Sequence, residues 1–258
     1  MNRVAVKIAY LGENFSGSQI QPGCRTVEGD VLSDLRMITK MNDTDIDLRL
    51  ASRTDRGVNS LGNVAVFYSG IGDPDILLRA LNAVSRDVFY RSIAFVGDEF
   101  NPRFADVRQY RYVLRSDGLN IPAMRSCAGL FSGEHDFTRF CKPDGKSARL
   151  MLNPIGIREE GGMVILDFSA RYFLWNMIRR ITSALISVGR GDSSLSDVKD
   201  ALDGKEITFG LARPDALTLL DIHYSGIEFI TPSADMFDKR VGEEMFRDGL
   251  RSMFFTSL

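Results

Sequence analysis

The chain has 258 residues, 44% hydrophobic and 26% charged, which is typical of a soluble globular protein with one large domain or two smaller ones. Its three cysteines lack CxxC spacing and its two histidines lie far apart, which disfavours a disulfide framework, a zinc site and a Ser-His-Asp triad and fits a reducing cytosol. A net charge of −2 does not by itself suggest a nucleic-acid binder. A strand-like N-terminus and the lack of an apolar run of ~20 residues predict a cytoplasmic protein without a signal peptide or membrane span.

The first hundred residues alternate between strand and helix patterns. Apolar residues recur at helical spacing over 26–40, where Thr26 is a plausible N-cap, and a second helix is expected over 73–84, which opens with Asp-Pro. Alternating or apolar extended segments fall at 4–12, 48–52, 63–69 and 87–96. The resulting order, β-α-β-β-α-β, is that of ferredoxin-like domains.

The second half also mixes strands and helices. Strands are expected at 108–116, 148–160, 161–170 and 216–227, and helices at 173–191, 192–204 and 236–250. The segment 133–141 suggests a short polar turn or a helix start, and a hairpin should turn at Glu160–Gly162. The helix over 173–191 has the clearest apolar stripe, and Gly189 lies where a C-cap is expected.

These patterns predict an α+β fold in two ferredoxin-like or RRM-like halves, 1–99 and 100–258. No close sequence repeat links the halves. Their mostly antiparallel sheets could join edge to edge into one central sheet and leave a cleft between them.

A basic block occupies the middle of the chain. Residues 100–190 carry 14 lysines and arginines against 8 acidic residues, a net charge of +6. Within it Arg103, Arg108, Arg111 and Arg115 are interleaved with phenylalanines and tyrosines. Cations beside aromatic rings suit a surface that grips a phosphate backbone and stacks on bases. An unevenly charged, solvated surface beside a core strand would give the same pattern.

The segment 51–60, ASRTDRGVNS, places Asp55 between Arg53 and Arg56. An ordinary charged turn explains this arrangement. The alternative is an ionised, positioned carboxylate that acts as a nucleophile, with arginines that hold phosphate or wedge into a base stack. Arg179 raises a similar question, because it lies off the apolar stripe of its helix and either faces solvent or pairs with a carboxylate across a cleft.

Five motifs follow one another along the chain. They are SRTDRGVNS at 52–60, FNPRFADVRQYRYVL at 100–114, FSGEHDFTRF at 131–140, FLWNMIRRITSALISVG at 173–189 and DALTL at 215–219. In this order they resemble motifs of the TruA family of tRNA pseudouridine synthases, which has GRTDAGVHA around its nucleophile. Each match is weak alone, but the order is specific and extends from the first strand to about residue 224.

The resemblance implies a role for each matching residue. Asp55 takes the position of the catalytic aspartate, Tyr110 that of the tyrosine that stacks on uracil and is a candidate to accept the C5 proton, and Arg179 that of the aspartate's partner. Arg53 matches the arginine that helps to flip the target nucleotide. The further candidates for substrate binding are Arg56, Arg103, Arg108 and Arg111. The family also implies tRNA as partner, a homodimer, an RNA-binding cleft, no cofactor and no metal.

The implied reaction converts uridine to pseudouridine in the anticodon stem-loop of tRNA, near positions 38–40. The target base must leave its stack to be reached. Asp55 would attack C6 of the base or C1′ of the sugar, and the sequence does not choose between them. Alternatives are the same chemistry on another tRNA uridine or another RNA, or an RNA-binding module without catalysis.

Four positions depart from the family pattern. Ser18 replaces a tryptophan in the first loop, Arg56 replaces a small residue, Asn59 replaces a histidine and Ala216 replaces a glycine. The segment between the second and third motifs is also shorter than in many bacterial members. The catalytic set is retained, so the departures concern how the substrate is gripped and therefore which uridine is modified.

Overall fold

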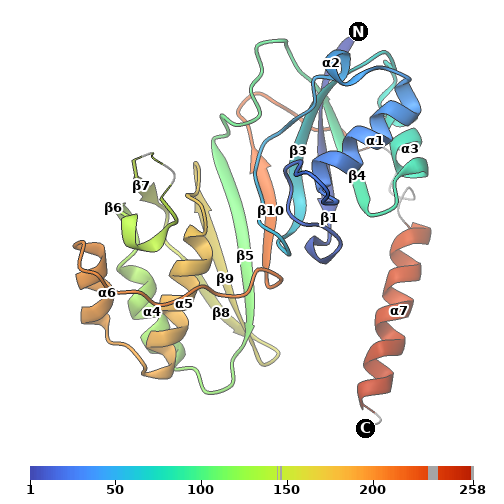
Figure 1. Cartoon of the computed structure of the whole chain (residues 1–258). Helices are drawn as coiled ribbons and strands as arrows, with labels where there is room; N and C mark the ends of the chain where they lie inside the picture. The colour runs from blue at the N-terminus through green and yellow to red at the C-terminus, as the bar shows by residue number, and fades with distance from the viewer. Residues whose placement is uncertain (144, 146, 232–237, 257–258) are drawn as a thin grey trace.

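The computed structural model describes residues 1–143, 145, 147–231 and 238–256, and its elements make a mixed α+β protein (Figure 1). The strands are β1 Asn2–Tyr10, β2 Arg49–Leu50, β3 Asn59–Ser69, β4 Val88–Phe95, β5 Val107–Arg115, β6 Gly133–Asp136, β7 Arg149–Leu152, β8 Gly156–Glu160, β9 Met163–Ala170 and β10 Leu217–His223. The helices are α1 Val27–Thr39, α2 Asp43–Ile46, α3 Pro74–Val84, α4 Ile121–Gly129, α5 Met177–Arg190, α6 Leu195–Leu202 and α7 Asp238–Thr256, with short 3-10 turns η1 Gly12–Asn14 and η2 Thr138–Phe140.

One large mixed sheet runs through the described part of the molecule. Its strand order is β4-β1-β3-β10-β5-β9-β8, with β2 paired to β3, while β6 and β7 form a separate small sheet. Strand β10 lies between β3 and β5, parallel to β3 and antiparallel to β5. Thr218 is opposite Asn59 and Leu219 is opposite Ser60. The sheet therefore continues from strands of the first hundred residues into strands of the later part.

Helices α1 and α3 cover one face of the sheet at the β4-β1-β3 end (Figure 1). The spacing of Val27, Val31 and Leu35 puts all three on one side of α1, and all three are fully buried. The predicted N-cap Thr26 is confirmed, because it accepts from the Gly29 amide, and Asp73, expected within the helix, instead caps α3 by accepting from its first amides. This end of the sheet thus has its own hydrophobic core.

A second core lies between β5, β9 and β10 and the helices α4, α5 and α6. The apolar stripe of α5 is buried as expected, but the helix boundaries differ from the prediction. The helix begins at Met177, after Asn176 in the left-handed region, and ends at Arg190, with Gly191 rather than Gly189 as its C-cap. Gly189 lies inside the helix, where a Cβ would come 2.7 Å from Cγ of Met124. The glycine is therefore a packing position for α4, not a cap.

Several other elements differ from the expected pattern. Helix α4 was not predicted, because its sequence IPAMRSCAG is short and rich in small residues. The segment 133–141, expected as a short polar turn or a helix start, contains the short turn η2, but strand β6 before it was not predicted. The hairpin at Glu160–Gly162 is confirmed, with β8 paired to β9, but 148–160 is divided because β7 pairs with β6.

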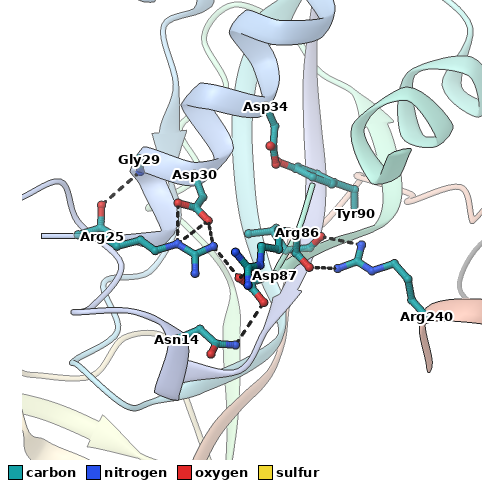
Figure 2. Close-up of polar contacts among 11 residues, drawn as sticks. Asn14, Arg25, Gly29, Asp30, Asp34, Arg86, Asp87, Tyr90 and Arg240 are labelled. Carbon is teal, nitrogen blue, oxygen red and sulfur yellow. Dashed lines mark hydrogen bonds and ion pairs between the residues drawn. The ribbon is translucent and has the colours of Figure 1, made fainter. Parts of the chain in front are cut away.

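An ionic cluster fastens the segment that follows β1 (Figure 2). The Arg25 guanidinium contacts Asp30 at 2.5 Å and Asp87 at 2.6 Å, and Asn14 donates to Asp87 at 3.4 Å. The guanidinium carbon of Arg25 also lies 5.0 Å from the centre of the Phe15 ring. These contacts join the base of the 14–25 loop to α1 and to the turn before β4.

Helix α7 confirms the helix expected over 236–250, although Met236 and Phe237 lie outside the described residues. Arg240 attaches its first turn to the body by donating to the carbonyls of Arg86 and Val88 (Figure 2). None of the helices in the described ranges combines the length and hydrophobicity that crossing a membrane requires.

The core beneath α3 gives a direct stability test. Leu81 is fully buried, whereas Ile76 on the same helix is 58% exposed. We expect Leu81→Ala to lower the free energy of unfolding by about 2–5 kcal/mol, because it removes packed methyl groups and leaves a cavity. Ile76→Ala should change it by less than about 0.5 kcal/mol. Urea denaturation of both variants checks this; equal losses would contradict the burial pattern.

Candidate active site

A cavity of about 580 Å³ opens beside the two central strands of the sheet. Tyr110 of β5 and Leu217 of β10 contribute to its floor, and the remaining lining residues come from three segments, 16–21, 51–58 and 172–179, together with Arg103 and Arg108. These segments are far apart in sequence. The large sheet and the packing of α5 bring them together.

Asp55 lies in this cavity with both carboxylate oxygens contacted. Arg179 Nη1 is 3.3 Å from Oδ2, and the indole Nε1 of Trp175 donates to Oδ1 at 3.0 Å. Arg179 is itself fixed, because its Nε donates to the Ala212 carbonyl at 2.7 Å. Of the two readings of Arg179 left open by the sequence, the structure shows the pairing with a carboxylate.

The strand-to-turn segment that carries Asp55 is held by buried polar contacts. The Thr54 amide donates to Ser18 Oγ at 2.8 Å, and the Ser18 amide donates back to the Thr54 carbonyl at 3.0 Å. The Thr54 hydroxyl meets the Tyr10 hydroxyl at 2.9 Å. The Asn63 side chain accepts from the Ser52 amide and donates to the Ser52 carbonyl. Buried polar groups that are all paired make a rigid local structure.

The turn itself depends on two glycines. Gly57 has φ +84°, a left-handed conformation that side chains rarely adopt, and Asp55 accepts a turn bond from the Val58 amide at 3.1 Å. Gly12 approaches this turn so closely that a Cβ would lie 2.3 Å from the Gly57 carbonyl carbon. The 11–14 segment therefore packs directly against the backbone that positions Asp55.

Tyr110 presents an aromatic surface to the cavity. Its ring meets Phe173 edge-on with centroids 5.2 Å apart, and the residue is only 7% exposed. Burial raises the pKa of Tyr110 to about 12, so its phenol is neutral at physiological pH. Within the described residues, no group of three or more His, Cys, Asp or Glu side chains is placed to hold a metal ion.

Comparison with known proteins agrees with this geometry. A family model described as tRNA pseudouridine synthase matches residues 127–225. Over 257 residues the chain is 39% identical to tRNA pseudouridine synthase A of Pyrococcus abyssi, an alignment that covers 98% of this chain and 96% of the relative. Its identity to the protein of the same name from Pyrococcus furiosus is 38%, covering 91% of this chain and 88% of the relative.

The chain belongs to the tRNA pseudouridine synthase A family. The resemblance seen in the five motifs is thereby confirmed, and the chain is an isomerase that forms pseudouridine in tRNA.

The expected substrate-binding arginines of the synthase fall into two groups. Arg53, Arg56 and Arg103 are exposed and line the cavity. Arg108 also lines it, but its guanidinium is buried and donates to Ser52 Oγ at 3.0 Å and to the carbonyls of residues 51, 103 and 171. Arg111 lies on the face of β5 opposite Tyr110. It pairs with Asp167 at 2.7 Å, outside the cavity lining. The first group is thus free to meet RNA, while the second holds the protein together.

Two of the four departures from the family pattern, Ser18 and Asn59, have visible structural roles. Ser18 supplies the bonds to Thr54 described above, and Asn59 accepts from the Gly12 amide and donates to the Asp215 carbonyl, both at 2.8 Å. Asn59 thus ties the turn region to the segment before β10. Ala216 accepts from the Val113 amide at 3.1 Å through its backbone carbonyl, a bond that a glycine would also make, so nothing in the structure explains the alanine side chain.

Sequence reasoning missed Trp175 as a site residue. The signal was available, because Trp175 is the only tryptophan of the synthase and precedes Arg179 by four residues. The prediction that the helix starts at 173 concealed it, because on a regular helix Trp175 would have been an ordinary surface residue. In the structure it lies in the turn before α5.

The close approach of Gly12 to the turn that carries Asp55 is testable. Gly12→Ala should displace the turn, and we expect pseudouridine formation to fall about a hundredfold, since displacements near 1 Å cost that much in oriented sites. Gly70→Ala is the matched control, because a Cβ there meets nothing within 4 Å. Single-turnover rates on a tRNA transcript, with thermal melts to verify folding, check this. A fully active Gly12→Ala variant would show that the close approach of Gly12 does not set the turn.

Proposed function

We propose that this synthase isomerises a uridine in the anticodon stem-loop of tRNA, near positions 38–40, with Asp55 as the nucleophile. The observation that carries the proposal is the placement of the Asp55 carboxylate in a cavity of about 580 Å³, 3.3 Å from the Arg179 guanidinium. The position in tRNA rests on the family resemblance. The aspartate mechanism rests on this geometry and on the matching motif.

The reaction breaks the N1–C1′ bond, turns the uracil and joins C5 to C1′. The C5 hydrogen leaves as a proton and N1 ends protonated, so the conversion needs no oxidant or reductant. Asp55 forms a transient bond to C6 of the base or to C1′ of the sugar, and that bond breaks again before product leaves. The 30% exposure of the Asp55 side chain is compatible with contact to either atom.

Arg179 positions the carboxylate in this proposal. Its side chain is 13% exposed and has a second anchor on Ala212, so it presents one fixed N–H to Oδ2. A fixed charge beside the reacting group needs little reorganisation during the reaction. Tyr110 provides a flat, neutral surface for the uracil, and its raised pKa favours stacking over proton abstraction by a phenolate at neutral pH.

Reaching a uridine inside a stem requires the base to leave its stack. Arg53 is exposed at the cavity, two residues from Asp55, and is the proposed flipping residue. Arg56 and Arg103 line the same cavity and are the proposed phosphate contacts. Within this proposal Arg108 keeps the 51–52 backbone in place instead of touching RNA.

The proposed division into halves, 1–99 and 100–258, is supported by the two cores. One core consists entirely of residues before 99, while the other is built mainly of later residues. In this arrangement the first half supplies Asp55 and Arg53, and the second supplies Arg179 and Tyr110. We further propose, from the family resemblance, ferredoxin-like halves and a homodimer that works without cofactor or metal.

A different target uridine is the second candidate. Arg56 is exposed, lines the cavity and departs from the family pattern, so the surface met by the RNA differs from that of typical relatives. Mapping pseudouridine in total tRNA from cells that lack the gene, with and without the added gene, separates the two candidates.

The roles of Asp55 and Arg179 are tested on a tRNA transcript by carbodiimide modification and primer extension. We expect Asp55→Asn to abolish the pseudouridine stop at the target. Arg179→Ala should lower kcat at least about a hundredfold and change RNA affinity less than threefold, because Arg179 acts through Asp55. Activity in Asp55→Asn, or no product with the wild type, would refute the mechanism.

Substitution of the exposed arginines at the cavity should weaken the affinity of the protein for RNA more than substitution of an arginine that is already paired within the protein. Arg103→Ala and Arg56→Ala should weaken tRNA binding, and each phosphate that the protein no longer neutralises should reduce the slope of log Kd against log salt by about one unit. Arg111→Ala is the control, because its guanidinium is engaged with Asp167 outside the cavity. Filter binding over a range of salt concentrations checks this. A slope change in Arg111→Ala equal to that of Arg103→Ala would show that RNA extends over the opposite face.

A further inference from the structure

The two donors to Asp55 differ in how firmly they are held. Arg179 is mostly buried, and both its side chain and its carbonyl are bonded to Ala212, at 2.7 Å and 3.2 Å. Trp175 is 47% exposed and lies in the turn that precedes α5. Oδ2 of Asp55 therefore has a fixed partner, and Oδ1 has a partner at the surface.

Trp175 is held in place from its solvent side. The ammonium of Lys142 stands 3.8 Å from the centre of the indole ring, and the Lys142 amide donates to the Trp175 carbonyl at 2.8 Å. Lys142 is itself exposed. An exposed cation–π contact contributes little free energy, so the contact with Lys142 adds little to the cost of moving the ring. The following residue, Asn176, has φ 64°, which separates the backbone of Trp175 from the regular helix.

The indole also occupies space that the substrate requires. Trp175 lines the cavity, and its N–H points at Oδ1, so its ring fills the region next to that oxygen. A nucleotide that enters from solvent meets the exposed indole before it meets the buried Arg179. If Asp55 is to bond C6 or C1′, a nucleotide atom must come closer to the carboxylate than the indole nitrogen now lies.

We propose that Trp175 is a positioning residue that covers Oδ1 of Asp55 in the empty enzyme and leaves it when a nucleotide enters the cavity. The inference rests on the proposed role of Asp55 as nucleophile. Before binding, the indole N–H and Arg179 together hold the carboxylate in one orientation. On binding, Arg179 keeps its contact with Oδ2 of Asp55, and the nucleotide takes the place of the indole next to Oδ1.

The single tryptophan makes this movement directly observable. All tryptophan emission of the protein comes from Trp175, next to the reacting carboxylate. We expect the emission of the free wild type to differ from that of Asp55→Ala, which lacks the carboxylate partner. Saturating tRNA transcript should move the wild-type spectrum toward that of free Asp55→Ala. Unchanged emission at saturation would overturn the proposal.

A control separates this movement from nonspecific quenching by RNA. The double variant Trp175→Phe, Phe95→Trp moves the only indole to an exposed position on β4, outside the cavity lining. Its emission should change much less than that of the wild type at the same tRNA concentration. An equal change in both proteins would mean that the wild-type signal is not evidence of displacement, and the proposal would fall.

Kinetics supply an independent test. Trp175→Phe keeps an aromatic ring but removes the N–H donor, so the nucleotide no longer has to displace a hydrogen bond to a carboxylate. We expect KM for tRNA to fall about three- to tenfold, with the gain in kcat/KM coming from KM. A fall in kcat with an unchanged or higher KM would show that the indole bond persists during the reaction.

Failure of this inference and failure of the proposed function give different results. Pseudouridine formation by the wild type is measured in the same preparations. If the wild type and Asp55→Asn behave as the function requires but the emission of Trp175 does not move, only the displacement of Trp175 is wrong. If the wild type forms no pseudouridine in tRNA, the proposed function fails whatever the fluorescence shows.

Discussion

The insertion of β10 between β3 and β5 is the constraint on which the site depends. Without this strand the sheet would end at β3 on one side and at β5 on the other. Contacts across the same junction include Lys7 with Asp221 at 2.5 Å and Asn59 with the Asp215 carbonyl at 2.8 Å. Because the junction fixes β3 relative to β5, it also fixes the turn before β3 relative to α5, which packs on β5 and β9. The approach of Asp55 to Arg179 follows from that placement.

The site then combines two kinds of support. The ion pair between Asp55 and Arg179 is partly exposed and contributes little to stability on its own. Rigidity comes from the buried polar contacts of Thr54 with Ser18 and Tyr10 and from the Arg108 guanidinium, which bonds three backbone carbonyls. Such groups would be costly to leave unpaired, so they hold the turn in one conformation. The Asp55 carboxylate can therefore remain accessible and still be held in one position.

Most regular elements could be predicted because their signals are local. The apolar spacing of α1, the Asp-Pro start of α3 and the alternation in β1 each lie within about a dozen residues. The errors occurred where distant packing decides. Gly189 resembles a C-cap, yet it is interior because Met124 packs against it. Strand β7 leaves the expected hairpin because β6, more than ten residues earlier, pairs with it.

The sequence by itself determined the family, through five motifs in order, and it singled out Asp55, Tyr110 and Arg179 as a set. Only the tertiary structure decided which arginines are free. Arg103, Arg108 and Arg111 look alike along the chain, but one lies exposed at the cavity, one is buried against backbone carbonyls and one pairs on the opposite face. The role of Trp175 was hidden for the same reason. A side chain's partners depend on the segments that folding brings near it, and for Arg179 and Asp55 these lie 124 residues apart in sequence.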